Sequence, residues 1–253
     1  MNNLMLKAKG VKQIDRNQLI SIDLPIATES YCPISNYEII QTAMEELDKQ
    51  GFRIKSEFHK TDSSMKKFVG GFIVSGGDNE MDLMFGYKNS YDKSMSAAYA
   101  LGVSILICSN SAVRGEEMMI RKHTGQANIV LKQAISEGIL KLGDNFQQTK
   151  VDFNKLKEVE TTKKTVASLI GQMYLNENII KSHQLSLIKK ELDVESYNYK
   201  VKNTAYNLYQ AVTHSLKTSH PMNYIADHAK LHKFMNSEFG LLVNKSELVA
   251  ELV

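Results

Sequence analysis

The sequence predicts an α+β fold, in which a helix packs on a mainly antiparallel sheet and a helical C-terminal region follows. A well-marked helical segment precedes several segments of period-two apolar alternation, which a glycine-rich turn interrupts. From about residue 126 onward, apolar residues recur at helical spacing instead. We therefore divide the chain into an α+β domain at 1–125 and a helical region at 126–253 that packs on it.

The helix predicted over residues 35–50 is the clearest single element. Ser35 followed by Glu38 three residues later forms a capping-box pattern, in which each side chain satisfies a free backbone N–H group. Gly51 lies where a left-handed residue is favoured at the end of a helix. Before this helix, residues 1–30 alternate weakly between apolar and polar side chains, as in the stretch 19–26, which predicts a strand and an extended entry segment.

Three antiparallel strands are predicted next, over residues 52–59, 66–75 and 80–87. In the first, Phe52, Ile54 and Phe58 alternate with charged residues. The pair Gly70–Gly71 in the second indicates a bulge or the close approach of another backbone. The segment Gly76–Asn79 is typical of a hairpin turn between the second and third strands.

The remaining elements follow from the length and the composition of each apolar run. Residues 94–102 are small and apolar and predict a short helix that ends at Gly102. Residues 103–110 predict a buried strand and residues 116–125 a further strand. Helices are predicted over 126–142, 150–173, 176–195, 197–217 and 222–236.

Composition places the chain among ordinary globular proteins. It has 253 residues, of which 43% are apolar and 23% charged, and a formal net charge of +3 that permits a polyanion partner without requiring one. Cys32 and Cys108 form no C-x-x-C pair, which excludes a zinc ribbon or a disulfide scaffold and favours reduced thiols. No apolar run reaches the ~18 residues of a membrane span, and no leader peptide is evident. We expect a cytoplasmic protein of the host cell with no membrane partner, and oligomerisation stays open.

Three groups of polar residues follow the ends of predicted strands. The predicted nucleic-acid or phosphate-binding residues in these groups are Lys88, Asn89, Ser90, Asp92, Lys93, Asn110, Arg121, Lys122, His123 and Thr124. If the three strand ends meet on one edge, the cations supply charge to a phosphate, while the amides and hydroxyls supply directed hydrogen bonds. The structural alternative pairs Asp92 with Arg121 or Lys122, uses the asparagines to satisfy turns, and makes His123 a hydrogen-bonded structural histidine.

Catalytic chemistry has less support in the sequence. His123 has the side chain of a general base at neutral pH, and Asp92 could orient it. No G-x-S-x-G elbow, Walker A loop or G-x-G-x-x-G fingerprint is present, so no cofactor is predicted and no reaction is assigned. Cys108 follows an apolar run and is expected to be an inert buried thiol.

The C-terminal region carries two further patterns. His228 and His232 have the i, i+4 spacing of two metal ligands, but the glutamate of H-E-x-x-H and a third ligand are missing. We predict no metal site and expect an exposed or interface face there. Tyr206 and Tyr209 recur at helical spacing with apolar neighbours, which favours a core stripe over a platform for stacking bases.

The run "GYKNSYDKSMSAAYALGVSILICSN" followed by "RKHTG" resembles the phage/plasmid-like family catalogued as a domain of unknown function of the DUF-932 type. The residues that match its motifs are Asn89, Ser90, Asp92, Lys93, Cys108, Asn110, Lys122, His123 and Thr124. Tyr91 stands where the family pattern has histidine, which weakens any role that requires an imidazole there. The resemblance covers most of residues 30–235 and implies a phage, prophage or plasmid setting.

Three functional hypotheses follow from these observations. The first is a phage- or plasmid-encoded nucleic-acid-binding accessory protein in DNA recombination or replication, and the helix-then-meander order also resembles single-strand annealing proteins of the Rad52 kind. The second is an enzyme that processes a nucleotide or phosphodiester with His123 and Asp92. The third is a non-catalytic binder of a host or phage protein, with the tyrosine-bearing helical region as its contact surface.

Overall fold

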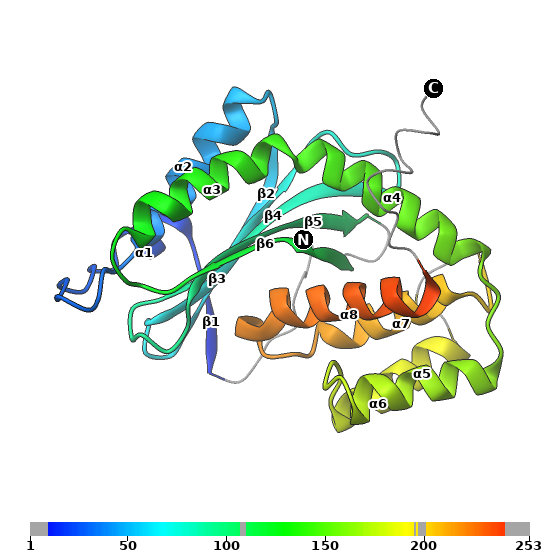
Figure 1. The fold of residues 1–253 in the computed structure, drawn as a ribbon. Coiled ribbons are helices and arrows are strands. Elements are labelled where there is room, and N and C mark those ends of the chain that lie inside the picture. The colour runs from blue at the N-terminus through cyan, green and yellow to red at the C-terminus, as the bar shows by residue number, and fades with distance from the viewer. Residues whose placement is uncertain (1–9, 107–109, 195, 197–200, 241–253) are drawn as a thin grey trace.

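Six strands form one open antiparallel sheet in the order in which they occur in the chain, as the computed structural model shows (Figure 1). The structure describes residues 10–106, 110–194, 196 and 201–240, and for residues 111 and 114–120 it describes the backbone alone. The strands are β1 (Val11–Ile14), β2 (Ile54–Asp62), β3 (Lys67–Val74), β4 (Met81–Ser90), β5 (Ala97–Ile105) and β6 (Ser111–Arg121). The predicted α+β class and its antiparallel sheet are confirmed.

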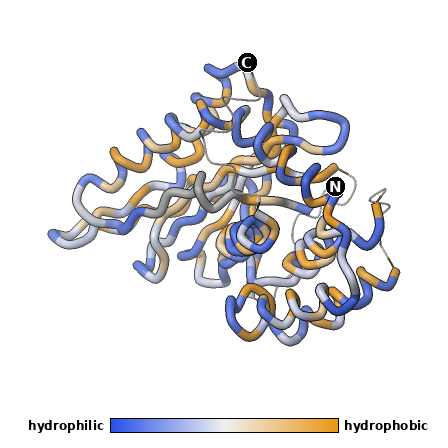
Figure 2. The backbone as a smooth tube through the Cα atoms, turned by 45° about the vertical axis from the view of Figure 1, so that its right-hand side comes forward, coloured by the Kyte–Doolittle hydropathy of each residue, from blue (hydrophilic) through white to orange (hydrophobic). Residues whose placement is uncertain are grey.

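Helices cover both faces of this sheet. They are α1 (Arg16–Ile20), α2 (Asn36–Lys49), α3 (Ala127–Leu140), α4 (Leu142–Glu158), α5 (Lys163–Leu175), α6 (Ser182–Asp193), α7 (Ala205–Leu216), the 3-10 helix η1 (Pro221–Asn223) and α8 (Tyr224–Phe239). In Figure 1, α2 and α3 lie over one face, α8 lies under the other, and α5 and α6 lie outside α7. Hydropathy alternates along the helices in Figure 2, as expected of amphipathic helices. None of the helices in the described ranges is long and apolar enough to cross a membrane.

Two hydrophobic clusters bury the two faces. Phe72, Phe85 and Tyr99 belong to the larger cluster, together with apolar residues of α2, α3 and α4. On the opposite face, Ala100 packs in a smaller cluster with Ile225 of α8. Because both faces are covered, every residue of β5 is buried, whereas an antiparallel strand with one wet face would alternate.

The short helix predicted over residues 94–102 is wrong, because most of that segment belongs to β5. Alanine and leucine favour a helix, but pairing with β4 on one side and β6 on the other outweighs that propensity. The small side chains serve packing: a Cβ atom built at neighbouring Gly86 would already lie 3.4 Å from Ile225 Cδ1. The strand predicted within residues 1–30 is present as β1, although the alternating stretch at 19–26 lies after it and holds no strand in the described residues.

A break in register explains a third difference. The pairing of β2 with β3 shifts between Ile54 and Ser56, which is a β-bulge. Phe52 and Ile54 therefore pack against the larger cluster, whereas Phe58 packs against the smaller cluster on the opposite face. The sequence predicts that Phe52, Ile54 and Phe58 share one face of the sheet, because they alternate with charged residues. That prediction is wrong for Phe58, since the bulge moves it to the opposite face.

The glycine pair in β3 marks a close approach, as predicted, and no bulge. Gly70 lies between His59 of β2 and Tyr87 of β4 in the register. A Cβ atom at Gly70 would lie 2.6 Å from His59 Nδ1 and 2.9 Å from Tyr87 Cε1. The missing side chain lets His59 Nδ1 and the Tyr87 hydroxyl hydrogen-bond at 2.9 Å across the intervening strand.

The helical region differs from the prediction chiefly at one break, and α4 also begins at Leu142, before the predicted start at residue 150. The helix predicted over residues 150–173 is two helices, because the chain becomes extended at Val159 and bridges Glu160 to Thr204. Thr162 then caps α5, and its side chain accepts a hydrogen bond from the Thr165 N–H group at 3.1 Å.

Candidate functional site

The polar run Lys88–Ser94 ends β4 and forms the turn that leads to β5. Asn89 in this run is fully buried. Its Nδ2 atom donates to the Ile34 carbonyl at 2.7 Å and to Asn36 Oδ1 at 2.9 Å, and its Oδ1 atom accepts from the Ser90 N–H group. Asn89 therefore fastens the end of β4 to the start of α2, which is a structural role.

Ser90 and Tyr91 continue this fastening. Ser90 Oγ donates to the Met95 carbonyl at 2.9 Å and accepts from the Met95 N–H group at 3.0 Å, which closes the turn. The Tyr91 hydroxyl accepts from the Asn36 N–H group at 3.0 Å. The capping box predicted for Ser35 and Glu38 is wrong, because Ser35 makes no side-chain cap bond and Tyr91 fills that place. Glu38 pairs instead with Lys132 of α3 at 2.6 Å.

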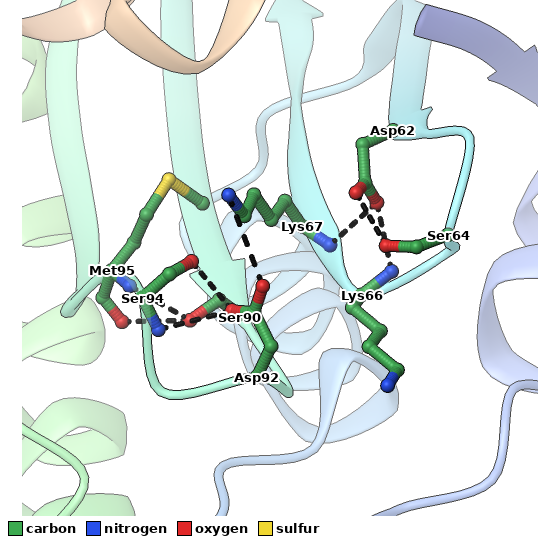
Figure 3. Close-up of polar contacts among 8 residues, drawn as sticks. All are labelled: Asp62, Ser64, Lys66, Lys67, Ser90, Asp92, Ser94 and Met95. Carbon is green, nitrogen blue, oxygen red and sulfur yellow. Dashed lines mark hydrogen bonds and ion pairs between the residues drawn. The ribbon is translucent and has the colours of Figure 1, made fainter. Parts of the chain in front are cut away.

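The turn after β4 lies beside the turn between β2 and β3 (Figure 3). Asp92 accepts hydrogen bonds from the N–H and hydroxyl groups of Ser94 and lies 3.8 Å from Lys67 Nζ. Asp62 accepts from the N–H groups of Lys66 and Lys67 in the neighbouring turn. Burial raises the pKa of Asp92, but the Ser94 hydrogen bonds and Lys67 outweigh it and hold that pKa below its usual value.

We call this region the hairpin end: the β2–β3 turn (63–66), the β4–β5 turn (91–96) and the segment after β6 (122–126). Exposed cations lie on each of the three, namely Lys66, Lys93, Lys122 and, at the last position of β6, Arg121. Lys93 has a left-handed backbone with φ of 64°, and its ammonium nitrogen lies 4.6 Å from the centre of the Tyr31 ring. Thr124 is exposed beside them.

His123 belongs to the same end but faces inward. It is only 6% exposed, and neither ring nitrogen makes a hydrogen bond to another described residue. Its ring centre lies 5.7 Å from that of Tyr31, and its carbonyl accepts from the Cys32 N–H group at 2.9 Å. Burial lowers the pKa of His123, with the Met95 backbone acting weakly in the opposite direction. No hydrogen bond joins it to Asp92 among the described residues.

The three predicted polar groups do not all meet. β4 ends at the hairpin end, where Ala97 of β5 lies opposite Arg121 of β6. β5 runs antiparallel to β4, so its C-terminal residue Ile105 lies opposite Met81, at the other end of the sheet. Asn110 therefore lies far from the other predicted residues. It is buried there and donates to Gln210 Oε1 at 2.7 Å, while Cys108 lies outside the described residues.

Three lysines that share one sheet face were not recognisable together from the sequence. Lys60 of β2 and Lys88 of β4 both lie in register with Val69 of β3, one on each side. Lys67 lies two residues before Val69 on the same face. The sequence predicts only Lys88 as a site residue. Lys60 and Lys67 are far from Lys88 in the chain, and only the pairing register of β2, β3 and β4 brings them beside it. Burial lowers the pKa of both Lys60 and Lys88.

The C-terminal patterns are interior. His232 is 2% exposed and lies within hydrogen-bond distance of Asp152 Oδ2, at 3.2 Å, and of the Tyr209 hydroxyl, at 3.3 Å. His228 is fully buried, so the expected exposed or interface face is incorrect. The interpretation of Tyr206 and Tyr209 as core is confirmed, and they offer no contact surface to a partner. Within the described residues, no group of three His, Cys, Asp or Glu side chains is placed to hold a metal ion.

Comparison with known protein families gives a match over most of the chain. The family model described as "Domain of unknown function (DUF932)" matches residues 26–235. The chain belongs to this family. No curated protein and no solved structure gives a significant match. The DUF932 match includes the sheet from β2 onward and both turns of the hairpin end, and its description assigns no activity.

Proposed function

We propose that this DUF932 protein binds nucleic acid through the hairpin end, as an accessory protein of a phage or plasmid in DNA recombination or replication. The observation that carries the proposal is the set of exposed cations on adjacent loops, namely Lys66, Lys93, Arg121 and Lys122. Such side chains bind a phosphate backbone and release its counterions. The net charge of the whole chain is only +3, but positive charge is concentrated at the hairpin end.

The acids in these turns offset only part of that charge. Asp62 accepts hydrogen bonds from backbone N–H groups and from Ser64 Oγ, and Asp92 is held by Ser94 and Lys67. These two carboxylates stay ionised, but the exposed cations of the hairpin end outnumber them. The turns are also fixed in place, since the Tyr91 N–H group donates to the Lys66 carbonyl at 2.7 Å. A fixed backbone lowers the entropic cost of binding a regular phosphate chain, because only the cationic side chains have to be ordered.

The test is fluorescence anisotropy with labelled single- and double-stranded DNA of equal length at several salt concentrations. The double variant Lys93→Ala/Lys122→Ala should bind more weakly and lower the log–log salt slope by roughly 1.4 to 1.8, since each phosphate contact contributes about 0.7 to 0.9. The matched control is Lys163→Ala/Lys164→Ala, which removes two exposed lysines at the start of α5, away from the sheet. No binding by the parent protein at low salt, or an equal loss in both variants, contradicts the proposal.

Acid–base catalysis by His123 and Asp92 has weaker support. The two ring nitrogens of His123 are shielded from solvent, and Asp92 is bonded to Ser94 and paired with Lys67. A general base must reach the proton that it removes. Binding at the exposed cations requires no such rearrangement, which is why we favour it.

A further inference from the structure

We propose a second anion site, which binds a phosphate monoester or pyrophosphate, between the sheet face that carries Lys60, Lys67 and Lys88 and the N-terminal ends of α6 and α8. It lies on the face opposite to α2 and α3. It is distinct from nucleic-acid binding at the hairpin end, because Lys60, Lys88 and Asp227 belong to it alone and its ligand is a compact anion; Lys67 is shared, through its ion pair with Asp92.

The sheet side of this site follows from the register. Val69 lies between Lys60 and Lys88 on adjacent strands, so the two lysine Cα atoms are roughly 10 Å apart. Lys67 is a diagonal neighbour of both, at a Cβ separation of about 7 Å. Val69 itself packs with Met222 of η1 and with the first residues of α8. The three lysines therefore surround the place where η1 meets the sheet.

The helix side contributes two more lysines around one carboxylate. Asp227 lies in the first turn of α8, and Lys181, Lys230 and Lys88 all act electrostatically on it. Lys181 is the N-cap of α6, so the N-terminal ends of α6 and α8 both approach this carboxylate. Burial raises the pKa of Asp227, while a hydrogen bond from Ser219 and the three lysines oppose that effect.

The balance of charge indicates the class of ligand. Lys60, Lys67 and Lys88 lie on this sheet face, and Lys181 and Lys230 act electrostatically on Asp227 beside it, whereas the acids are Asp227 and, at the outer margin, Asp62 and Asp92. Ammonium groups on flexible stems act as point charges toward phosphate oxygens. Lys60 and Lys88 are half-buried, so water screens their charge less than it screens an exposed lysine. A small anion of high charge suits such a site better than a neutral or apolar ligand does.

Isothermal titration of the full chain with inorganic pyrophosphate tests the proposal through two changes of opposite sign. Lys88→Met keeps the aliphatic stem and should weaken binding about tenfold, because it removes a charged hydrogen-bond donor. Asp227→Asn keeps the shape of the side chain and should tighten binding about threefold, because it removes the nearest competing anion. Lys163→Ala on α5 is the control and should leave the affinity unchanged. Lys60→Met replaces Lys88→Met if that variant does not fold, since Lys60 lies on the same sheet face, whereas Lys67 pairs with the hairpin-end carboxylate Asp92.

A second experiment distinguishes two sources of the anion, a free polyphosphate and the 5′-phosphate at the end of a nucleic-acid strand. Oligonucleotides with a 5′-phosphate and with a 5′-hydroxyl are compared in the parent protein and in Asp227→Asn. If the protein binds the 5′-phosphorylated oligonucleotide more tightly, and this preference is larger in Asp227→Asn, the natural ligand is the end of a nucleic-acid strand. If the protein binds pyrophosphate but shows no such preference, the natural ligand is a free polyphosphate. No pyrophosphate binding at low salt, or weaker binding in Asp227→Asn, overturns the proposal, whatever the hairpin-end variants do.

Discussion

Replacing Gly70 with alanine tests how β2, β3 and β4 fit together. The added Cβ atom would lie 2.6 Å from His59 Nδ1, 2.7 Å from the Phe58 carbonyl oxygen and 2.9 Å from Tyr87 Cε1. Real Cβ atoms do not approach neighbours so closely, and one of the three is backbone. The strands must separate or the His59 and Tyr87 side chains must move, so the substitution should destabilise the fold.

The magnitude follows from two effects. Overpacking of a well-filled site typically costs about 1 to 3 kcal/mol. Loss of the 2.9 Å hydrogen bond between His59 and Tyr87 leaves buried polar groups without their partner, which costs about 1 to 2 kcal/mol more. We therefore expect Gly70→Ala to lower the free energy of unfolding by roughly 2 to 5 kcal/mol and Tm by about 5 to 15 °C.

Urea unfolding followed by circular dichroism measures this loss. The matched control is Gly171→Ala in α5, where a Cβ atom would meet nothing within 4 Å. Since alanine is the better helix former, Gly171→Ala should raise the free energy of unfolding by about 0.5 to 1 kcal/mol. A change of less than about 0.5 kcal/mol in Gly70→Ala would refute the packing described for β3.

Two other predictions concern Tyr91 and the buried histidines. Tyr91→Phe removes the hydroxyl that accepts a hydrogen bond from the Asn36 N–H group. The free energy of unfolding, measured by urea titration, should fall by about 1 kcal/mol. An unchanged midpoint of urea unfolding would show that water replaces the lost hydrogen bond. Burial lowers the pKa of His59, His123 and His214, so the folded state favours the neutral imidazoles. The stability they contribute is complete above the unfolded pKa near 6.5 and is lost as the pH falls through the lowered folded values. Urea titrations at pH 7.5 and 5.5 should show this loss, and His123→Gln should reduce it; equal stability at both pH values speaks against the assignment.

The sequence was sufficient to predict the elements whose conformation depends mainly on residues close to one another in the chain. The helix at Asn36–Lys49 and the turn at Gly76–Asn79 were predictable because period and turn residues determine them. The strand at Ala97–Ile105 was not, because its conformation depends on two neighbouring strands and on α8 packed against its small side chains.

The candidate site divides in the same way. Asp92, Lys93 and Lys122 were found because they follow strand ends that do meet. Asn110 was included incorrectly, since the direction of each strand decides which ends share an edge. Lys60 and Lys67 became neighbours of Lys88 only through the register, and a sequence with a bulge near Ile54 does not reveal that register.

The strand order also has a kinetic meaning. Because every strand pairs with its neighbours in the chain, most of the sheet can form from contacts that are close in sequence. Packing of Ile225 over Gly86 joins residues far apart in the chain, so the smaller cluster closes a long loop. The loop-closure entropy of such a contact must be offset before the contact itself stabilises the fold, which delays non-local packing relative to local pairing. We therefore expect the meander to assemble early and α8 to dock late, so the face that carries Lys60 and Lys88 is the last part of the molecule to acquire its native surroundings.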